Sequence, residues 1–221
     1  MDRLSAKKPK NRLSRDIVVR KAIEIANRDE IHALSMRRLA KDLGVEAMSL
    51  YHHFPSKEAL LDTMIDLVFT EIVLPPKGKW RDRLRARAIS ARAALVRHRW
   101  ALGLMESRTS PGMVTLQHHD AMLGCLRRNG FSIAAAAHAY SLLDSYVYGF
   151  VLQQLNLPFN TFEESGEAAQ SIMTAVAAGQ YPYLVELATQ HVLLPGYDYA
   201  KEFEIGLDVV LNGLEQLRLA N

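Results

Sequence analysis

The sequence contains a single cysteine, Cys125, among its 221 residues. One thiol cannot close a disulfide within the chain or build a cysteine-based metal cluster, which agrees with a reducing compartment. The chain also lacks an uninterrupted apolar run of membrane-spanning length, so we expect no membrane partner. No apolar segment follows the basic N-terminus, which argues against a secretory signal. We therefore expect a cytoplasmic protein.

The sequence shows no glycine-rich phosphate loop, no nucleophile elbow and no cluster of metal ligands at a suitable spacing. His52 and His53 are adjacent, but neighbouring helical residues point about 100° apart and do not easily share one ion. The many carboxylates fall at solvated helical positions. We expect no catalytic residues, no metal site and no cofactor.

The charged residues are unevenly distributed along a chain whose formal net charge is +3. Residues 1–58 hold 13 Lys/Arg against 8 Asp/Glu, and residues 77–108 hold 10 against 2. Residues 156–221 hold only 2 Lys/Arg against 9 Asp/Glu. The two basic blocks are candidates for contact with a polyanion, although charge alone does not choose between them.

The stretch 35–57 reads SMRRLAKDLGVEAMSLYHHFPSK and has the pattern of a helix-turn-helix. Two short amphipathic segments, 35–43 and 46–53, meet at a turn around Gly44, where glycine tolerates a positive φ. The alternative interpretation is a helical hairpin without a DNA-binding role, which would share some of these features. The residues expected to form or to fit against the small core are Leu39, Ala40, Leu43, Val45 and Leu50.

Helical periodicity continues on both sides of this stretch, so we expect an all-α protein. Residues 1–14 are predicted to be a flexible basic arm, residues 15–55 a helix-turn-helix domain, and residues 56–221 a larger helical domain. Serines are plausible N-caps before several helices: Ser14, Ser35, Ser56 and Ser132. The expected later helices are a linking helix over 56–74, then 80–98, 100–106, 113–128, 132–156, short helices near 162–178 and 182–193, and 198–219.

The predicted last helix carries apolar residues on more than one face. Phe203, Leu207, Val210 and Leu214 form one face, while Ile205, Val209, Leu211 and Leu217 lie elsewhere around the helix. A surface helix of a monomer needs only one apolar face, so the excess indicates a second copy of the chain. The alternative is a helix buried centrally in its own domain.

Four segments together resemble the tetracycline-repressor (TetR) family of bacterial one-component regulators. They are residues 34–40 (LSMRRLA), 43–45 (LGV), 50–54 (LYHHF) and 57–61 (KEALL). The resemblance implies a three-helix DNA-binding domain, joined by the linking helix to a ligand-binding and dimerisation domain. It also implies a homodimer formed through the 132–156 and 198–219 helices.

The second helix of the motif is the expected recognition helix, which lies in the major groove of operator DNA. Its outward candidates are Glu46, Ala47, Met48, Ser49, Tyr51 and His52. The resemblance implies phosphate contacts from Tyr51 and Lys57, and base reading by Arg37, whose guanidinium can grip guanine. Ala47 and Met48 offer no bidentate hydrogen-bonding group, so we expect an operator different from that of the tetracycline repressor.

The resemblance further implies a small-molecule effector bound in the larger domain. The candidate ligand-binding residues suit an apolar or aromatic molecule and are Trp100, Met105, Met113, His118, Met122, Tyr140 and Tyr146. Plain core packing is the alternative for each of them. The expected function is a repressor released from its operator by this molecule. The alternative function is an all-helical dimeric interaction protein without specific DNA binding.

Overall fold

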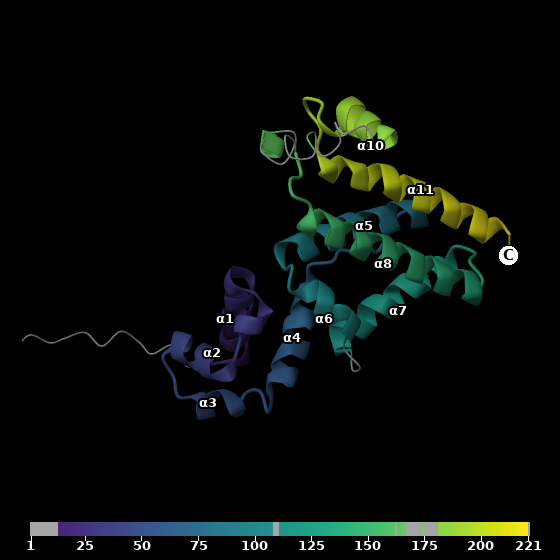
Figure 1. Ribbon diagram of the computed structural model, residues 1–221. Coiled ribbons are helices and arrows are strands. Elements are labelled where there is room, and N and C mark those ends of the chain that lie inside the picture. The colour runs from purple at the N-terminus through teal and green to yellow at the C-terminus, as the bar shows by residue number, and fades with distance from the viewer. Residues whose placement is uncertain (1–12, 108–110, 162, 167–173, 175–180, 221) are drawn as a thin grey trace, which may run out of the picture.

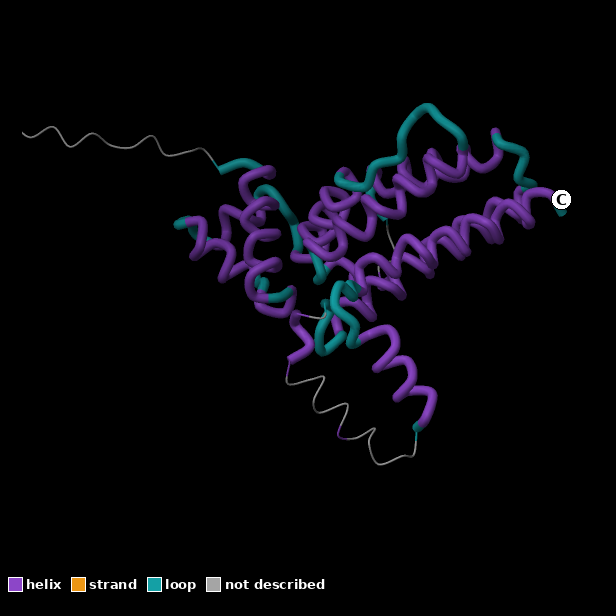
Figure 2. Tube along the Cα trace, turned by 90° about the horizontal axis from the view of Figure 1, so that it is seen from above, coloured by secondary structure: helices purple, strands orange, loops and turns teal. Residues whose placement is uncertain are grey.

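The computed structural model describes residues 13–107, 111–161, 163–166, 174 and 181–220. Helices connected by loops account for the described residues, and no strand occurs among them, as Figure 2 shows. The all-α prediction is therefore confirmed. The predicted arm lies outside the described residues except for Leu13 and Ser14, and so does most of the predicted helix near 162–178.

The N-terminal part has the predicted helix-turn-helix arrangement at one end of the molecule (Figure 1). Ser14 and Ser35 cap two of its helices, because their hydroxyls accept from Ile17 N at 3.3 Å and Arg38 N at 3.2 Å. Gly44 ends the second helix with a φ of 67°, the conformation for which glycine was expected. The elements are α1 (Arg15–Asp29), the short 3₁₀ helix η1 (Ile31–Ala33), α2 (Met36–Leu43) and α3 (Ala47–Tyr51).

The linking helix α4 (Lys57–Thr70) leads from this part to the rest of the molecule. The Ser56 hydroxyl caps its start by accepting from Ala59 N at 3.2 Å. The helix ends four residues before the predicted 74. Val73 N donates instead to the hydroxyl of Ser90 on the following helix, at 2.9 Å, which draws the chain away from the helical path.

The C-terminal domain stacks α5, α8 and α11 beside one another, and α7 lies against α4 and α8 (Figure 1). In both views the C-terminus lies at the end of the molecule remote from α1–α3. No helix among the described residues is long and apolar enough to span a membrane. The elements are α5 (Trp80–Arg97), α6 (Ala101–Ser107), α7 (Met113–Arg128), α8 (Ile133–Asn156), α10 (Pro182–Leu187), the π-helix η2 (Ala188–Val192) and α11 (Tyr199–Leu219).

A buried ion pair crosses the core of this domain. The sequence predicts that the arginines of α5 lie outside its apolar face, yet Arg87 is only 1% exposed. Its Nη1 pairs with the carboxylate of Asp144 on α8, which is also buried. A buried guanidinium is costly without a partner, so this pair fixes α5 and α8 relative to each other.

Hydrogen bonds around Asn27 join α1 to the C-terminal domain. The side-chain oxygen of Asn27 accepts from Trp100 Nε1 at 2.6 Å, which fixes the orientation of the amide. The same oxygen lies 3.0 Å from Nδ1 of the buried His98, whose Nε2 lies 3.0 Å from a carboxylate oxygen of Glu71. Both ring nitrogens of His98 therefore face acceptors. This Asn27 junction ties the end of α1 to the loops after α4 and α5.

We predict that Asn27→Ala lowers the free energy of unfolding. The change leaves the buried Trp100 Nε1 and His98 Nδ1 without their acceptor, at a cost of about 1–3 kcal/mol for each group. Urea unfolding followed by circular dichroism measures the loss. Arg28→Ala is the matched control, because the Arg28 side chain is 56% exposed and its loss should cost less than about 0.5 kcal/mol. Equal stability of the two variants would contradict the prediction.

Candidate DNA-binding surface and ligand cavity

The candidate DNA-contacting residues lie on α2, on α3 and its flanks, and at the start of α4. Buried residues fix this region from behind, since Leu39, Leu50 and Phe54 are fully buried and Ala40 is 2% exposed. Packing therefore presents the opposite side of α3 to solvent. We call the following set the recognition surface: Arg37, Glu46, Ala47, Met48, Ser49, Tyr51, His52 and Lys57.

Arg37 and Arg38 are neighbours on α2 but have different surroundings. Arg38 points back into the domain, where its Nη2 pairs with the carboxylate of Asp29 at the end of α1. Arg37 is exposed and, within the part of the chain that the structure describes, pairs with no carboxylate. Its five donors are thus free to meet an external acceptor such as guanine or phosphate.

The exposure of the recognition helix differs in part from the prediction. Met48 is 70% exposed, Tyr51 is 43% exposed, and Glu46 and His52 are also exposed, as expected. Ala47 and Ser49 are only half-buried rather than fully outward. α3 is five residues long and packs on α2 through the buried Leu50, and Ala47 and Ser49 lie beside this contact. Met48 is the most prominent apolar side chain that this helix offers to a groove.

Lys57 is the first residue of α4 and is half-buried. The Ser56 hydroxyl accepts from Ala59 N at this helix end, whose dipole favours an anion. Beside it, Arg15 holds the loop between α3 and α4: its Nη1 donates to the carbonyl of His53 at 2.6 Å, and its guanidinium lies 4.3 Å from the centre of the Phe54 ring. These contacts fix the position of Lys57 relative to α3.

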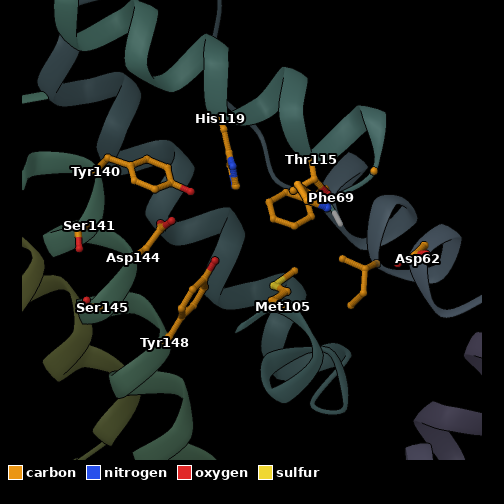
Figure 3. A pocket seen from close by; sticks show the side chains of 13 residues that line it. Asp62, Phe69, Met105, Thr115, His119, Tyr140, Ser141, Asp144, Ser145 and Tyr148 are labelled. Carbon is orange, nitrogen blue, oxygen red and sulfur yellow. The ribbon is translucent and has the colours of Figure 1, made fainter. Parts of the chain in front are cut away.

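A cavity of about 520 Å³ lies between α4, α6, α7 and α8. Its volume is in the range of pockets for drug-sized ligands. Figure 3 shows the apolar side chains of Phe69 and Met105 on one side of the cavity and polar side chains of α8, such as Tyr140 and Asp144, on the other. The lining residues are Asp62, Ile65, Phe69, Met105, Pro111, Gly112, Thr115, His119, Tyr140, Ser141, Asp144, Ser145 and Tyr148.

The polar side of the cavity is a stripe along α8. Its members recur at helical spacing on a helix that is otherwise mostly apolar: Tyr140, Ser141, Asp144, Ser145 and Tyr148. Two phenols and a carboxylate, from Tyr140, Tyr148 and Asp144, thus point into one space, and Ser141 and Ser145 lie at its margin (Figure 3). Opposite them, Ile65, Phe69 and Met105 supply apolar surface. The cavity suits a ligand with an apolar or aromatic body and a polar edge.

Two neighbouring histidines of α7 have different roles at this site. The His119 ring lines the cavity and lies between the rings of Tyr140 and Phe69, with centres 5.2 and 5.7 Å away (Figure 3). Nε2 of His118 instead accepts from Arg87 Nε at 3.1 Å. Burial, together with the Arg87 charge, lowers the pKa of His118 to about 4. Burial also lowers the pKa of His119, so both rings are neutral near pH 7.

Only two of the seven predicted ligand-binding residues, Met105 and Tyr140, line the cavity. Trp100 is buried in the Asn27 junction, and Met122 is fully buried in the core. Met113 is 67% exposed at the first turn of α7. His118 turns toward Arg87, about 100° around the helix from His119. Tyr146 donates to the carbonyl of Phe203 at 2.8 Å and stacks on its ring, so it holds α8 against α11.

The sequence held a usable signal for part of the lining that was missed. The stripe of polar residues on α8 interrupts an apolar helix every three or four positions, which marks a face turned to something other than core. The contributions of α4, Asp62, Ile65 and Phe69, carry no comparable signal, because that helix is apolar around most of its surface. Among the described residues, no group of three or more His, Cys, Asp or Glu is placed to hold a metal ion.

Two family models match the chain, one for each part. Residues 18–64 match the bacterial regulatory proteins of the tetR family, and residues 74–218 match the tetracyclin repressor-like C-terminal domain. Tetracycline repressor protein class C from Escherichia coli is 32% identical over 213 residues, covering 95% of this chain and 94% of the relative. HTH-type transcriptional repressor DrrR1 from Streptomyces coeruleorubidus is 32% identical over 225 residues, covering 95% and 80%.

Solved structures show the same architecture. Apo ActR from Streptomyces coelicolor superposes with a TM-score of 0.77 at 28% identity, covering 96% of this chain and 98% of ActR. The complex of ActR with actinorhodin superposes with a TM-score of 0.76 at 29% identity, covering 93% and 98%. The two-part helical arrangement is therefore shared along nearly the whole chain.

We predict that His118→Gln weakens the pH dependence of stability. The pKa of His118 is about 4 in the folded chain and about 6.5 when unfolded, so between these values the unfolded chain binds more protons. The contribution of neutral His118 to the free energy of unfolding is thus fully present above pH 6.5, and it is lost as the pH falls toward 4. Glutamine can accept from Arg87 but does not titrate in this range. Melting curves between pH 7 and 4.5 should show a smaller decrease for this variant.

The control for this prediction is His138→Gln, which changes an exposed histidine of α8. It should leave the pH dependence as in the wild type. A His118→Gln protein that loses as much stability on acidification as the wild type would contradict the assignment.

Proposed function

The chain belongs to the TetR family of bacterial regulatory proteins, and we propose that it is a dimeric repressor that leaves its operator when a small molecule fills the α4–α8 cavity. Proteins of this family are DNA-binding transcription regulators, and so is this chain. The observation that carries the proposal is the recognition surface, where Arg37 and Tyr51 are exposed on a frame fixed by buried Leu39 and Leu50. A regulator acting on bacterial DNA works in the cytoplasm.

The recognition surface supplies both kinds of contact that DNA recognition needs. Tyr51 and Lys57 are placed to bind phosphates, which position the protein on the duplex. Arg37 can read a guanine with two hydrogen bonds, worth about 1–3 kcal/mol of discrimination. Met48, 70% exposed, offers an apolar contact that suits a thymine methyl group. The operator we infer therefore combines a guanine opposite α2 with thymine near the middle of α3.

A homodimer through α8 and α11 accounts for the apolar side chains on their outer faces. Leu142 and Leu152 of α8 are 48% and 55% exposed, and Ile205 and Val209 of α11 are 62% and 68% exposed. The inner face of α11 is already occupied, since Phe203, Leu207, Leu211 and Leu214 are buried against the domain. The alternative of a centrally buried α11 is therefore disfavoured. Pairing two copies buries the outer stripe and sets two recognition surfaces at a fixed separation.

The effector we propose has an apolar or aromatic body and a polar edge. ActR, a structural relative, has been solved with actinorhodin and with (S)-DNPA, so related chains take small organic ligands. In this chain the body would pack on Phe69 and Met105, while the edge would meet the polar stripe of α8. Binding acts as a population shift, because it favours the conformation in which the cavity fits the ligand.

A catalytic role finds no support in the residues of the cavity. The cavity brings His119, Ser141, Ser145 and Asp144 to one space, but Asp144 is engaged by Arg87 rather than by a histidine. Arg37 and the exposed side of α3 favour the regulator.

We predict that the protein selects a specific duplex from a random DNA pool, and that Arg37→Ala and Tyr51→Ala each weaken binding to it. Arg37→Ala should cost about 1–3 kcal/mol, or roughly 5- to 150-fold in dissociation constant, and should relax the preference at one base pair. Tyr51→Ala should weaken binding evenly across sequences. Gel shifts at several salt concentrations measure both effects, and affinity should fall steeply as salt rises.

Arg128→Ala is the control, because it removes an exposed arginine at the end of α7, far from the recognition surface. If the wild-type protein selects no duplex, the proposal of a sequence-specific DNA-binding regulator is rejected. Unchanged affinity of both variants, with circular dichroism as in the wild type, would reject the recognition surface.

We predict that Ile205→Asp converts the dimer into a monomer, because it places a charge in an apolar interface. Light scattering after size-exclusion chromatography should give about twice 24.8 kDa for the wild type and about 24.8 kDa for the variant. Val73→Asp, at a position 54% exposed in the loop after α4, should remain dimeric. A wild-type chain that is monomeric at micromolar concentration would refute the dimer.

A further inference from the structure

A carboxylate of α4 caps the start of α7. Oδ1 of Asp66 accepts from the backbone N of Thr115 at 3.2 Å and from its hydroxyl at 2.8 Å, and Oδ2 accepts from Val114 N at 3.3 Å. Val114 and Thr115 are the second and third residues of α7, whose N–H groups have no partner within the helix. The residue at the N-cap position, Gly112, has no side chain to serve them. A negative charge also favours this end of the helix dipole.

Gly112 leaves the space that this cap occupies. A Cβ added at Gly112 would lie 2.2 Å from Oδ2 and 2.4 Å from Cγ of Asp66, much closer than real contacts allow. The backbone of Gly112 has φ −73° and ψ 174°, an extended conformation open to any residue. Glycine is therefore required here for room and not for backbone freedom. Two residues 46 positions apart in sequence thus fit one another.

The cap stands in the wall of the ligand cavity. Ile65 and Phe69, which flank Asp66 on α4, line the cavity, and so do Gly112 and Thr115 on the α7 side. A molecule in the cavity therefore contacts α4 and α7 close to the Asp66 cap. α4 continues from here to its packing against α1 and to Lys57 of the recognition surface. The Asp66 cap is thus a polar contact between the wall of the cavity and the helix that begins at Lys57.

We propose that Asp66 is the positioning residue that holds α4 against α7, and thereby sets the separation of the two recognition surfaces in the dimer. This inference rests on the proposed function as a dimeric operator-binding protein. Two recognition surfaces that are already held at the spacing of successive major grooves bind DNA with little further loss of conformational entropy. Recognition surfaces whose separation varies must be ordered on binding, which weakens the affinity. A ligand in the cavity acts on this separation by shifting Thr115 and Gly112 relative to α4.

The experiment measures how strictly the protein demands the spacing of its half-sites. Operator duplexes are made with the selected spacing and with one base pair inserted between the half-sites, which moves them apart by about 3.4 Å and rotates one by about 35°. The dissociation constants of wild type, Asp66→Ala, Gly112→Ala and the double variant are measured for both duplexes. Asp120→Ala is the matched control, because it removes an exposed aspartate from α7, the helix that Asp66 caps.

We expect Asp66→Ala and Gly112→Ala each to weaken binding to the selected spacing at least about fivefold, the low end of measured couplings between sites. Their preference for the selected spacing over the inserted one should decrease. The double variant should bind no more weakly than either single variant, because both changes break the same cap. Asp120→Ala should behave as the wild type.

A merely structural role for Asp66 would lower the melting temperature but leave the spacing preference intact, and that result would overturn the inference. Losses that multiply in the double variant would also overturn it. Asp66→Asn, which keeps the shape and one acceptor oxygen, should fall between wild type and Asp66→Ala, and provides the test if Asp66→Ala does not fold. Failure of the wild type to bind any selected duplex would reject the proposed function itself, a result distinct from the others.

Discussion

The arrangement of the molecule depends on the linking helix α4, which packs against both the N-terminal helices and the C-terminal domain. It packs against α1 on one side and against α6 and α7 on the other. Leu60, Met64 and Val68 along its length are fully buried, so no part of it is free to bend into solvent. A helix embedded at both ends moves as a rigid body, and a shift at the cavity end must appear at Lys57. The position of Lys57 in the recognition surface thus depends on contacts made further along the same helix.

Polar contacts give this packing its registry. The hydrophobic effect is non-directional, so apolar contacts alone define the relative position of two packed helices only weakly. Hydrogen bonds near 3 Å require defined geometry. The Asn27 junction provides them between α1 and the loops of the C-terminal domain, and the Asp66 cap provides them between α4 and α7. Both sites are partly or fully shielded from water, where an unmatched partner is costly. Together they join the two parts at two separate points.

The features that could be predicted from the sequence are those whose cause is local. Ser14, Ser35, Ser56 and Ser132 were expected as N-caps, and each accepts from an N–H three residues later. Gly44 was expected at positive φ because a helix ended there. The TetR resemblance itself rests on such a compact local stretch. The helix starts and the turn of the helix-turn-helix follow from it, and the recognition surface is predicted from it.

The features that could not be predicted depend on partners far apart in sequence. Arg87 looked like one more solvated arginine of α5, and only the approach of Asp144, 57 residues later, makes its burial tolerable. Trp100 and Met122 look like ligand contacts or core equally well, since periodicity shows that a side chain turns inward but not whether it meets a cavity. Gly112 gave no sign of its role, because the space it leaves is filled from another helix.

The strength of the Asp66 cap suits a joint that a ligand must be able to move. A capping side chain at a helix N-terminus is worth about 0.5–2 kcal/mol, and a tenfold change in operator affinity corresponds to about 1.4 kcal/mol. A ligand acts on this contact only through the difference between its affinities for the capped and the uncapped state, and a hundredfold difference, about 2.8 kcal/mol, exceeds the cost of breaking the cap. The joint is therefore strong enough to influence operator binding, yet weak enough to yield. A buried ion pair such as Arg87–Asp144, whose disruption costs about 3–5 kcal/mol, would resist the same ligand far more. This difference favours the Asp66 cap as the movable contact and the Arg87–Asp144 pair as the fixed one.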